Sequence, residues 1–138
     1  MTGSGDERPD EIELRLGAEL TNLPIIRSLT SSIAMRADFD LDAIADLKLA
    51  VDEACSTLVT RAAPDAVLKC VFKVSKDEIR FVVSIVSTND AAPSNDSFGW
   101  RVLTTLTDHT NSWVEPNGQS GQHLVHIELA KRRADGPA

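Results

Sequence analysis

The stretch DLKLAVDEACSTLV, residues 46–59, combines a helical apolar pattern with polar side chains that a purely structural helix does not need. Glu53 and Thr57 lie four residues apart, so a helix brings them to one face, almost opposite the apolar face. A carboxylate in that place can orient or deprotonate a substrate group, and a neighbouring hydroxyl can contribute to a metal site. The same spacing also describes an ordinary solvated face, and the pattern alone leaves both interpretations open.

The histidines and cysteines offer weaker candidates for chemistry. His123 and His126 form an H-x-x-H in an alternating segment, where a separation of three places them on opposite faces of a sheet and disfavours a shared metal. His109 stands at an expected helix end, where an imidazole favours the helix dipole. Cys55 and Cys70 lie among apolar residues and form no CxxC, so we expect buried free thiols rather than a disulfide or a metal pair.

The periodicity of the chain predicts the elements that must position these residues. Alternation predicts strands over residues 11–18, 66–75, 78–87, 111–115 and 123–129, and helical spacing predicts helices over about 20–38, 41–62 and 98–108. The runs 66–75 and 78–87, joined by Lys-Asp, indicate a hairpin. This order predicts an α+β two-layer sandwich, with helices on one face of a mainly antiparallel sheet and the other face left for solvent or a partner.

Helical projection assigns a buried stripe to each of the first two helices. In the first helix the stripe contains Ile25, Leu29 and Ile33, with Ile26 as a further candidate. In the second, the sheet-facing stripe is Ile44, Leu47, Val51, Cys55, Leu58 and Ala62, whereas Asp46, Leu49 and Ala50 share the outer face with Glu53. Trp100 and Trp113 are expected in the core or in an interface rather than on a ligand platform.

Composition and charge exclude several classes of protein. With 138 residues, a net charge of -7 and 42% hydrophobic residues, the chain fits one domain. We expect that domain over 11–130, between a disordered tail (1–10) and a flexible tail (131–138). The acidic balance argues against a nucleic-acid binder and favours a basic protein partner. Neither a signal peptide nor a membrane-spanning run is evident, so a cytoplasmic protein is expected.

Three motifs carry a resemblance to a known family. LKLAVDEACSTLV resembles the nucleotide-site helix of the GHKL ATPase superfamily, most of all that of RsbW-type anti-sigma factors, L-x-x-A-V-x-E-A-x-x-N-A. FGWRVLTTLTD resembles the family's second glycine box, G-x-G-L-x-L-x-x-x-L-x-D, with Gly99 at the second glycine and Asp108 at the terminal acid. LPIIRSLTSSIA stands at the usual distance before Glu53. The resemblance covers about Glu11 to Leu129, and LAVDEAC is most similar to mycobacterial and other actinobacterial members.

This resemblance implies a Bergerat-type fold, an ATP site and protein partners. In the family the helix Glu orients or deprotonates the attacking group and the Asn four residues later holds Mg²⁺; these positions are Glu53 and Thr57. Members bind an alternative sigma factor of the general-stress, sigma-F type, release it to a STAS-domain anti-anti-sigma protein and usually form homodimers. Arg27 matches a family arginine on the surface that both partners share, although an ordinary solvated arginine also explains it.

The sequence departs from the family at the positions that bind nucleotide. Thr57 replaces the Mg²⁺-binding Asn, and its hydroxyl is a shorter ligand that lacks the amide carbonyl. The family's D-x-G-x-G box is missing, because no glycine occurs between residues 65 and 98. Its adenine-reading aspartate has no clear counterpart, Asp90 being the nearest acid.

The second glycine box is altered as well. Ser97 replaces its first glycine, and the bulky Trp100 follows Gly99, where it can fill space that a nucleotide needs. Phosphate cradles depend on glycine because backbone N–H groups must approach the anion closely. We therefore expect weak or absent Mg-ATP binding at Glu53, Thr57 and Gly99, and inhibition by stoichiometric binding without efficient catalysis. The alternative is an active RsbW-type serine kinase that uses ATP to phosphorylate its anti-anti-sigma partner.

Overall fold

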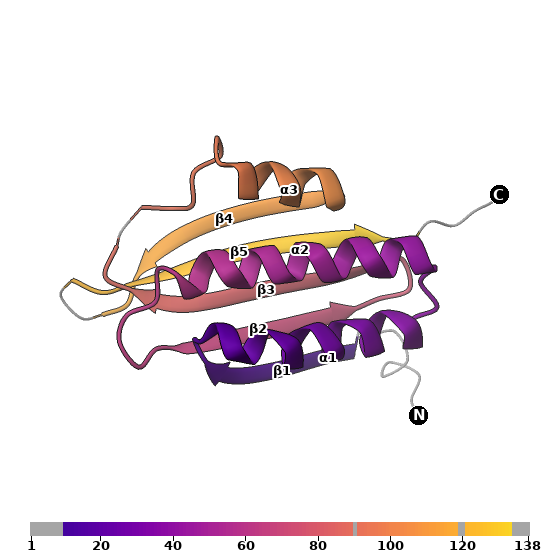
Figure 1. The fold of residues 1–138 in the computed structure, drawn as a ribbon, viewed down its shortest axis with the longest axis horizontal. Helices are drawn as coiled ribbons and strands as arrows, with labels where there is room; N and C mark the ends of the chain where they lie inside the picture. The colour runs from indigo at the N-terminus through magenta and orange to yellow at the C-terminus, as the bar shows by residue number, and fades with distance from the viewer. Residues whose placement is uncertain (1–9, 90, 119–120, 134–138) are drawn as a thin grey trace, which may run out of the picture.

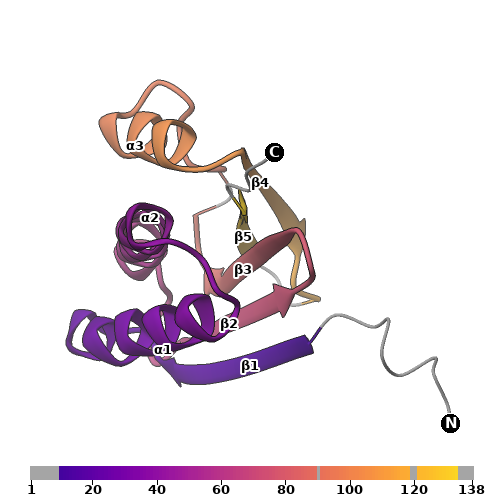
Figure 2. The same ribbon diagram turned by 90° about the vertical axis from the view of Figure 1, so that its right-hand side faces the viewer.

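The computed structural model describes residues 10–89, 91–118 and 121–133. Its elements in chain order are β1 (Asp10–Gly17), the short 3-10 helix η2 (Leu20–Asn22), α1 (Leu23–Arg36), α2 (Leu41–Val59), β2 (Val67–Val74), β3 (Glu78–Ser87), α3 (Phe98–Leu106), β4 (His109–Pro116) and β5 (His123–Arg132). The five strands form one antiparallel sheet in the order β1-β2-β3-β5-β4. Figures 1 and 2 show α1, α2 and α3 on the same face of this sheet, with α2 in the middle. The predicted α+β two-layer sandwich is confirmed.

Helix α2 begins at a side-chain cap, whereas α1 has none. Asp40 is the N-cap of α2, and its Oδ1 accepts a hydrogen bond of 2.8 Å from the backbone N–H of Ala43. Asn22 precedes α1, but its side-chain amide donates to the Gly17 carbonyl at 2.8 Å instead of capping the helix. The predicted end of the second helix at residue 62 is wrong. Helix α2 ends at Val59, and Ala62 forms an isolated β-bridge beyond it.

Two of the predicted helix faces also need correction. Ile25 is 51% exposed, whereas the neighbouring Ile26 is buried, as is Ile33. Ala50, predicted on the outer face with Glu53, is completely buried. Figure 2 gives the reason, because α2 has α1 on one side and α3 on the other, so its buried surface extends beyond the face that meets the sheet.

The prediction of buried free thiols is confirmed for Cys55 on α2 and Cys70 on β2. The pKa of the Cys55 thiol is raised well above its ordinary value, first by its hydrogen bond with the Cys70 thiol and then by burial. Since the thiolate is the nucleophilic form of cysteine, a thiol held protonated inside the core is a poor nucleophile. Cys55 therefore belongs to the packing of α2 on the sheet.

The sheet extends slightly beyond the domain boundaries that the sequence predicted. Strand β1 begins at Asp10, and β5 continues to Arg132, so Lys131 and Arg132 lie in the sheet rather than in a tail. Lys131 Nζ donates to the Leu106 carbonyl at 3.0 Å and contacts Asp46 Oδ2 at 3.3 Å, which ties β5 to the helical layer. Residues 1–9 and 134–138, which make up most of the tails predicted at 1–10 and 131–138, lie outside the described residues. Within the part that is described, no helix is long and apolar enough to cross a bilayer.

Candidate functional site

Glu53, Thr57 and Gly99, the residues that the motifs assign to a nucleotide, line one hollow of about 410 Å³. Its walls come from the C-terminal half of α2, from the segment between β3 and α3, and from the start of α3. The other lining residues are Ser56, Thr60, Arg61, Pro93, Ser94 and Ser97. The volume falls at the lower end of the range of small-molecule sites, roughly 300–1,000 Å³. The three residues thus meet at one place, and nucleotide binding there stays a prediction.

Glu53 lies directly against the backbone of α3. A Cβ atom at position 99 would overlap the Glu53 carboxylate, so only a glycine at this position allows the carboxylate to lie where it does. Thr57 Oγ1 donates a hydrogen bond of 3.3 Å to Glu53 Oε2. The carboxylate also lies at the first turn of α3, where the partial positive charge of a helix N-terminus favours an anion. The Glu53 carboxylate therefore lies against Gly99, the glycine that the motifs assign to a ligand-binding box.

Ser97, which replaces the first glycine of that box, has a structural role. It is the N-cap of α3, and its Oγ accepts from the Trp100 backbone N–H at 3.0 Å and donates to the Ser94 carbonyl at 3.0 Å. Trp100 itself does not line the hollow. Its half-buried ring packs against the hydrophobic core, so the expectation that it fills nucleotide space is wrong, whereas the expectation of a core position is confirmed.

Arg61 is a residue of this hollow that the sequence analysis missed. Its Nη1 donates a hydrogen bond to the carbonyl oxygen of Ala91, which fastens the segment between β3 and α3 to the end of α2. The sequence could have indicated this residue, because Glu53, Thr57 and Arg61 follow one another at intervals of four, the spacing of residues on one helix face. Asp90, the acid nearest to the position of the family's adenine-reading aspartate, lies outside the described residues.

Arg27 lies away from this hollow, on the surface of α1. Its Nε and Nη2 both donate to Asp52 Oδ1 on α2, at 3.3 and 2.8 Å. The ion pair is partly exposed, with 44% of the Arg27 side chain and 32% of the Asp52 side chain accessible. Asp52, to which the sequence assigned no role, therefore fixes the orientation of Arg27. Asp52 and Glu53 are adjacent in sequence, yet one serves the α1–α2 surface and the other the α2–α3 hollow.

The histidines lie on the sheet. His126, on the face that carries no helix, stacks on Trp113 with ring centroids 4.8 Å apart and contacts Ser84 Oγ at 2.6 Å and Glu115 Oε2 at 2.7 Å. The helix-dipole role predicted for His109 is wrong, because α3 ends at Leu106 and His109 begins β4, with Nε2 3.3 Å from Glu128 Oε1.

Among residues 10–89, 91–118 and 121–133, no group of three or more His, Cys, Asp or Glu side chains is arranged to hold a metal ion.

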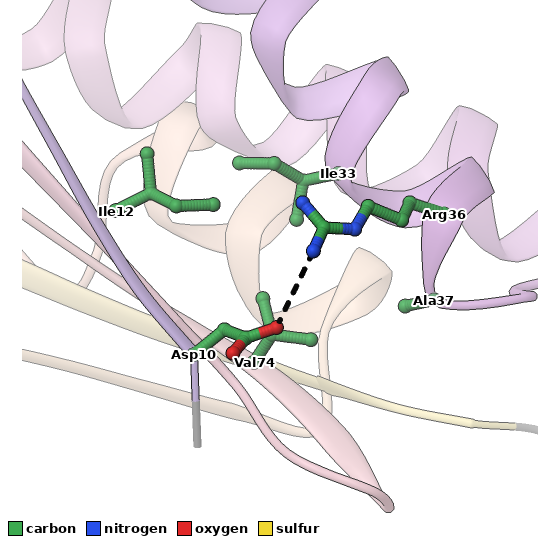
Figure 3. A pocket seen from close by; sticks show the side chains of 6 residues that line it. All are labelled: Asp10, Ile12, Ile33, Arg36, Ala37 and Val74. Carbon is green, nitrogen blue, oxygen red and sulfur yellow. Dashed lines mark ion pairs between the residues drawn. The ribbon is translucent and has the colours of Figure 1, made fainter. Parts of the chain in front are cut away.

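A smaller hollow of about 110 Å³ opens between α1 and the β1 edge of the sheet (Figure 3). Ile12, Ile33 and Val74 form its apolar walls, and the Arg36 guanidinium reaches across its mouth to within 3.9 Å of Asp10. A nucleotide does not fit in that volume. This small hollow is therefore not the nucleotide site that the motifs predict.

Comparison with known proteins places the chain in a family. No family model matches it. The anti-sigma-F factor RsbW of Mycobacterium tuberculosis is 40% identical over 124 residues, which is 89% of this chain and 74% of that protein. The chain belongs to the RsbW family. The serine-protein kinase RsbW of Bacillus cereus is 32% identical over 80 residues, which is 56% of this chain and 50% of that protein.

Membership of the RsbW family agrees with the architecture. The helices and the five-stranded antiparallel sheet form the α+β sandwich of GHKL proteins that the three motifs predicted. A match covering 89% of the chain necessarily includes α1, α2 and α3, and therefore both the Arg27 surface and the Glu53 hollow.

Proposed function

We propose that this protein is an anti-sigma factor that binds an alternative sigma factor of the general-stress, sigma-F type and keeps it from RNA polymerase. The observation that carries the proposal is the 40% identity to an anti-sigma-F factor RsbW, which extends through 89% of the chain. A STAS-domain anti-anti-sigma protein competes for the inhibitor and releases the sigma factor. The inhibitor acts as a homodimer in the cytoplasm.

Inhibition proceeds by stoichiometric binding, because the nucleotide site is degenerate. Glu53 and Thr57 are hydrogen-bonded to each other, and the glycine box is filled by the Glu53 carboxylate. Arg61, the cation of this hollow, is engaged with the Ala91 carbonyl. Binding of Mg-ATP would have to break these internal contacts before it gained its own, so we expect a dissociation constant in the millimolar range or weaker in a calorimetric titration.

The second candidate is an active serine kinase, and the retained acid at Glu53 together with the Bacillus relatives favours it. That activity requires micromolar Mg-ATP affinity and transfer of phosphate to a serine of the anti-anti-sigma partner. Replacing Glu53 by alanine then lowers the rate of transfer, whereas in a degenerate site the same change leaves ATP affinity and phosphate transfer at background.

The ion pair between Arg27 and Asp52 allows a sharp test of sigma-factor binding. In the first variant, Arg27→Ala, we expect affinity to fall by about thirtyfold, the effect of a strong interface residue. In the second, Arg27→Asp combined with Asp52→Arg, the internal ion pair is restored with its polarity inverted. Thermal stability should then recover while affinity stays low. Recovery of affinity in the swapped variant would mean that Arg27 acts only through the fold.

A further inference from the structure

A polar groove runs between α1 and α2 on the helical side of the molecule, separate from the Glu53 hollow. Figures 1 and 2 both show these two helices side by side. The groove has a volume of about 410 Å³ and is lined by Pro24, Arg27, Ser28, Ser31, Ser32 and Lys48. All of these except Lys48 belong to α1, and Lys48 faces them from α2.

The charge of this groove opposes that of the chain. The protein has a net charge of -7, yet the charged residues that line the groove are the cations Arg27 and Lys48. In another hollow, at the start of α2, the carboxylate of Asp46 contacts Lys131 at 3.3 Å. In the α1–α2 groove Arg27 is paired with Asp52, which does not itself line the groove, whereas Lys48 has no ion-pair partner among the described residues.

Both cations keep donors available for a partner. Asp52 accepts from Nε and Nη2 of Arg27, while the Nη1 group makes no hydrogen bond within the described part of the chain. Lys48 lies one turn before Asp52 on α2, but Asp52 is paired with Arg27, and no carboxylate of the described residues lies within ion-pair distance of Lys48. Asp52 therefore positions one cation and leaves the other free.

Hydroxyl groups cover the floor between the two cations. Ser28 and Ser32 are exposed, and the half-buried Ser31 donates only a weak contact, 3.8 Å, to the sulfur of Met35. Hydroxyls can both donate and accept, so they suit an extended backbone or carboxylates that bridge two cations. This arrangement favours a segment with two nearby acidic side chains over an apolar helix.

We propose that the α1–α2 groove binds an acidic segment of a protein partner, with one carboxylate on Arg27 and a second on Lys48. That this partner is the sigma factor rests on the proposed function, and Lys48 is the new residue of that interface. A nucleic-acid phosphate backbone is the less favoured occupant, because two cations on an acidic protein give little counterion release.

The groove can be tested without any assumption about the partner. The full chain, labelled with ¹⁵N, is titrated with hexaglutamate peptide, with hexalysine peptide and with single-stranded DNA. We expect hexaglutamate to shift the amide signals of Ser28, Ser31 and Lys48, and Lys48→Glu to abolish these shifts. The matched control is Lys76→Glu, the same charge change at an exposed lysine in the turn between β2 and β3, which should leave the shifts intact.

The second measurement uses the sigma factor that the wild-type chain binds. We expect Lys48→Gln, which removes the charge of a partly exposed contact, to weaken this binding about threefold. Lys48→Glu makes the contact repulsive and should weaken binding about tenfold. Lys76→Glu should leave the affinity unchanged. Circular dichroism melting establishes that each variant folds, and the milder Lys48→Gln keeps the test valid if Lys48→Glu is destabilised.

The outcomes separate the two proposals. If hexaglutamate shifts no groove amide, or shifts them equally in Lys48→Glu, the groove proposal is wrong. A stronger response of these amides to DNA than to hexaglutamate would overturn it in favour of a nucleic-acid site. If the peptide binds as expected but no sigma factor does, the groove proposal stands while the proposed function fails. If a sigma factor binds and Lys48→Glu has no effect, the function stands and the groove proposal fails.

Discussion

Replacing Gly99 by alanine probes the contact between this glycine and the Glu53 carboxylate. A Cβ at position 99 would overlap the Glu53 carboxylate, which is the mobile end of its side chain and can turn away. Turning away breaks the hydrogen bond from Thr57, worth about 1 kcal/mol, and loses the favourable position at the start of α3, worth about 0.5 kcal/mol. The loss is therefore about 1.5 kcal/mol in the free energy of unfolding.

The same substitution also has a benefit, because alanine is favoured over glycine inside a helix by about 0.5–1 kcal/mol. In the wild-type background we expect Gly99→Ala to destabilise the protein by about 0.5–1 kcal/mol. In a Glu53→Ala background the clash is absent, so Gly99→Ala should stabilise by about 0.5–1 kcal/mol. The sign of the effect thus depends on Glu53, with a coupling energy of about 1.5 kcal/mol.

Urea unfolding measures this cycle, and the fluorescence of Trp100, next to the site, and of Trp113 reports the transition. Gly17→Ala is the control, since a Cβ there meets its nearest neighbour at an ordinary 3.6 Å and should show no coupling to Glu53. If Gly99→Ala has the same effect in both backgrounds, within about 0.3 kcal/mol, Glu53 does not lie on Gly99 in solution. The account of a site filled by its own carboxylate would then be refuted.

Three further predictions concern other contacts. Because the pKa of Cys55 is raised in the folded state, its contribution to stability is complete below the unfolded pKa of about 8.5. Above that pH the free energy of unfolding should fall by up to about 1.4 kcal/mol per pH unit, a slope that denaturation between pH 7 and 10 measures and that Cys55→Ala should reduce. Arg61→Ala removes the bond to Ala91, so hydrogen exchange in the segment between β3 and α3 should rise several-fold while α1 is unchanged. Asp40→Ala removes the cap on Ala43 and should cost about 1 kcal/mol in urea denaturation.

The fold followed from signals that act over a few residues. Alternating residues predicted the strands, and the pairing of 67–74 with 78–87 confirms the hairpin indicated by the Lys-Asp turn. Asp40, the N-cap of α2, belongs to a residue type that favours helix starts, because its short carboxylate can accept from the backbone N–H of the third helical residue. Sequence reasoning therefore gave the layers, since periodicity states which faces of each element must be covered.

It was harder to predict which face of each helix is buried. Helix α1 carries Leu23, Ile25, Ile26, Leu29 and Ile33, and more than one stripe fits so many apolar residues. Helix α2, which carries the buried Ala50, is flanked by α1 and by α3, and the chain reaches α3 only after the hairpin. A helix flanked on both sides has no simple outer face, and projection of a single helix cannot show this.

In the candidate site, too, some contacts could be predicted from local sequence and others could not. The spacing of Glu53 and Thr57 predicted their proximity, and the glycine-box motif predicted that Gly99 belongs near them. The pairing of Arg27 with Asp52, and of Arg61 with Ala91, joins residues 25 and 30 positions apart, so it depends on how helices and loops meet in the folded chain. Such contacts leave no local pattern to read.

Competition with RNA polymerase for a sigma factor tests directly whether this protein is an anti-sigma factor. Each alternative sigma factor of the source organism is labelled with a fluorophore, bound to core RNA polymerase and titrated with this protein in the absence of nucleotide. The account predicts that one of them, of the general-stress, sigma-F type, is displaced in proportion to added inhibitor, and that the STAS-domain antagonist reverses the displacement. If the polymerase-bound fraction of every sigma factor stays constant at excess inhibitor, the protein is not an anti-sigma factor of the kind proposed.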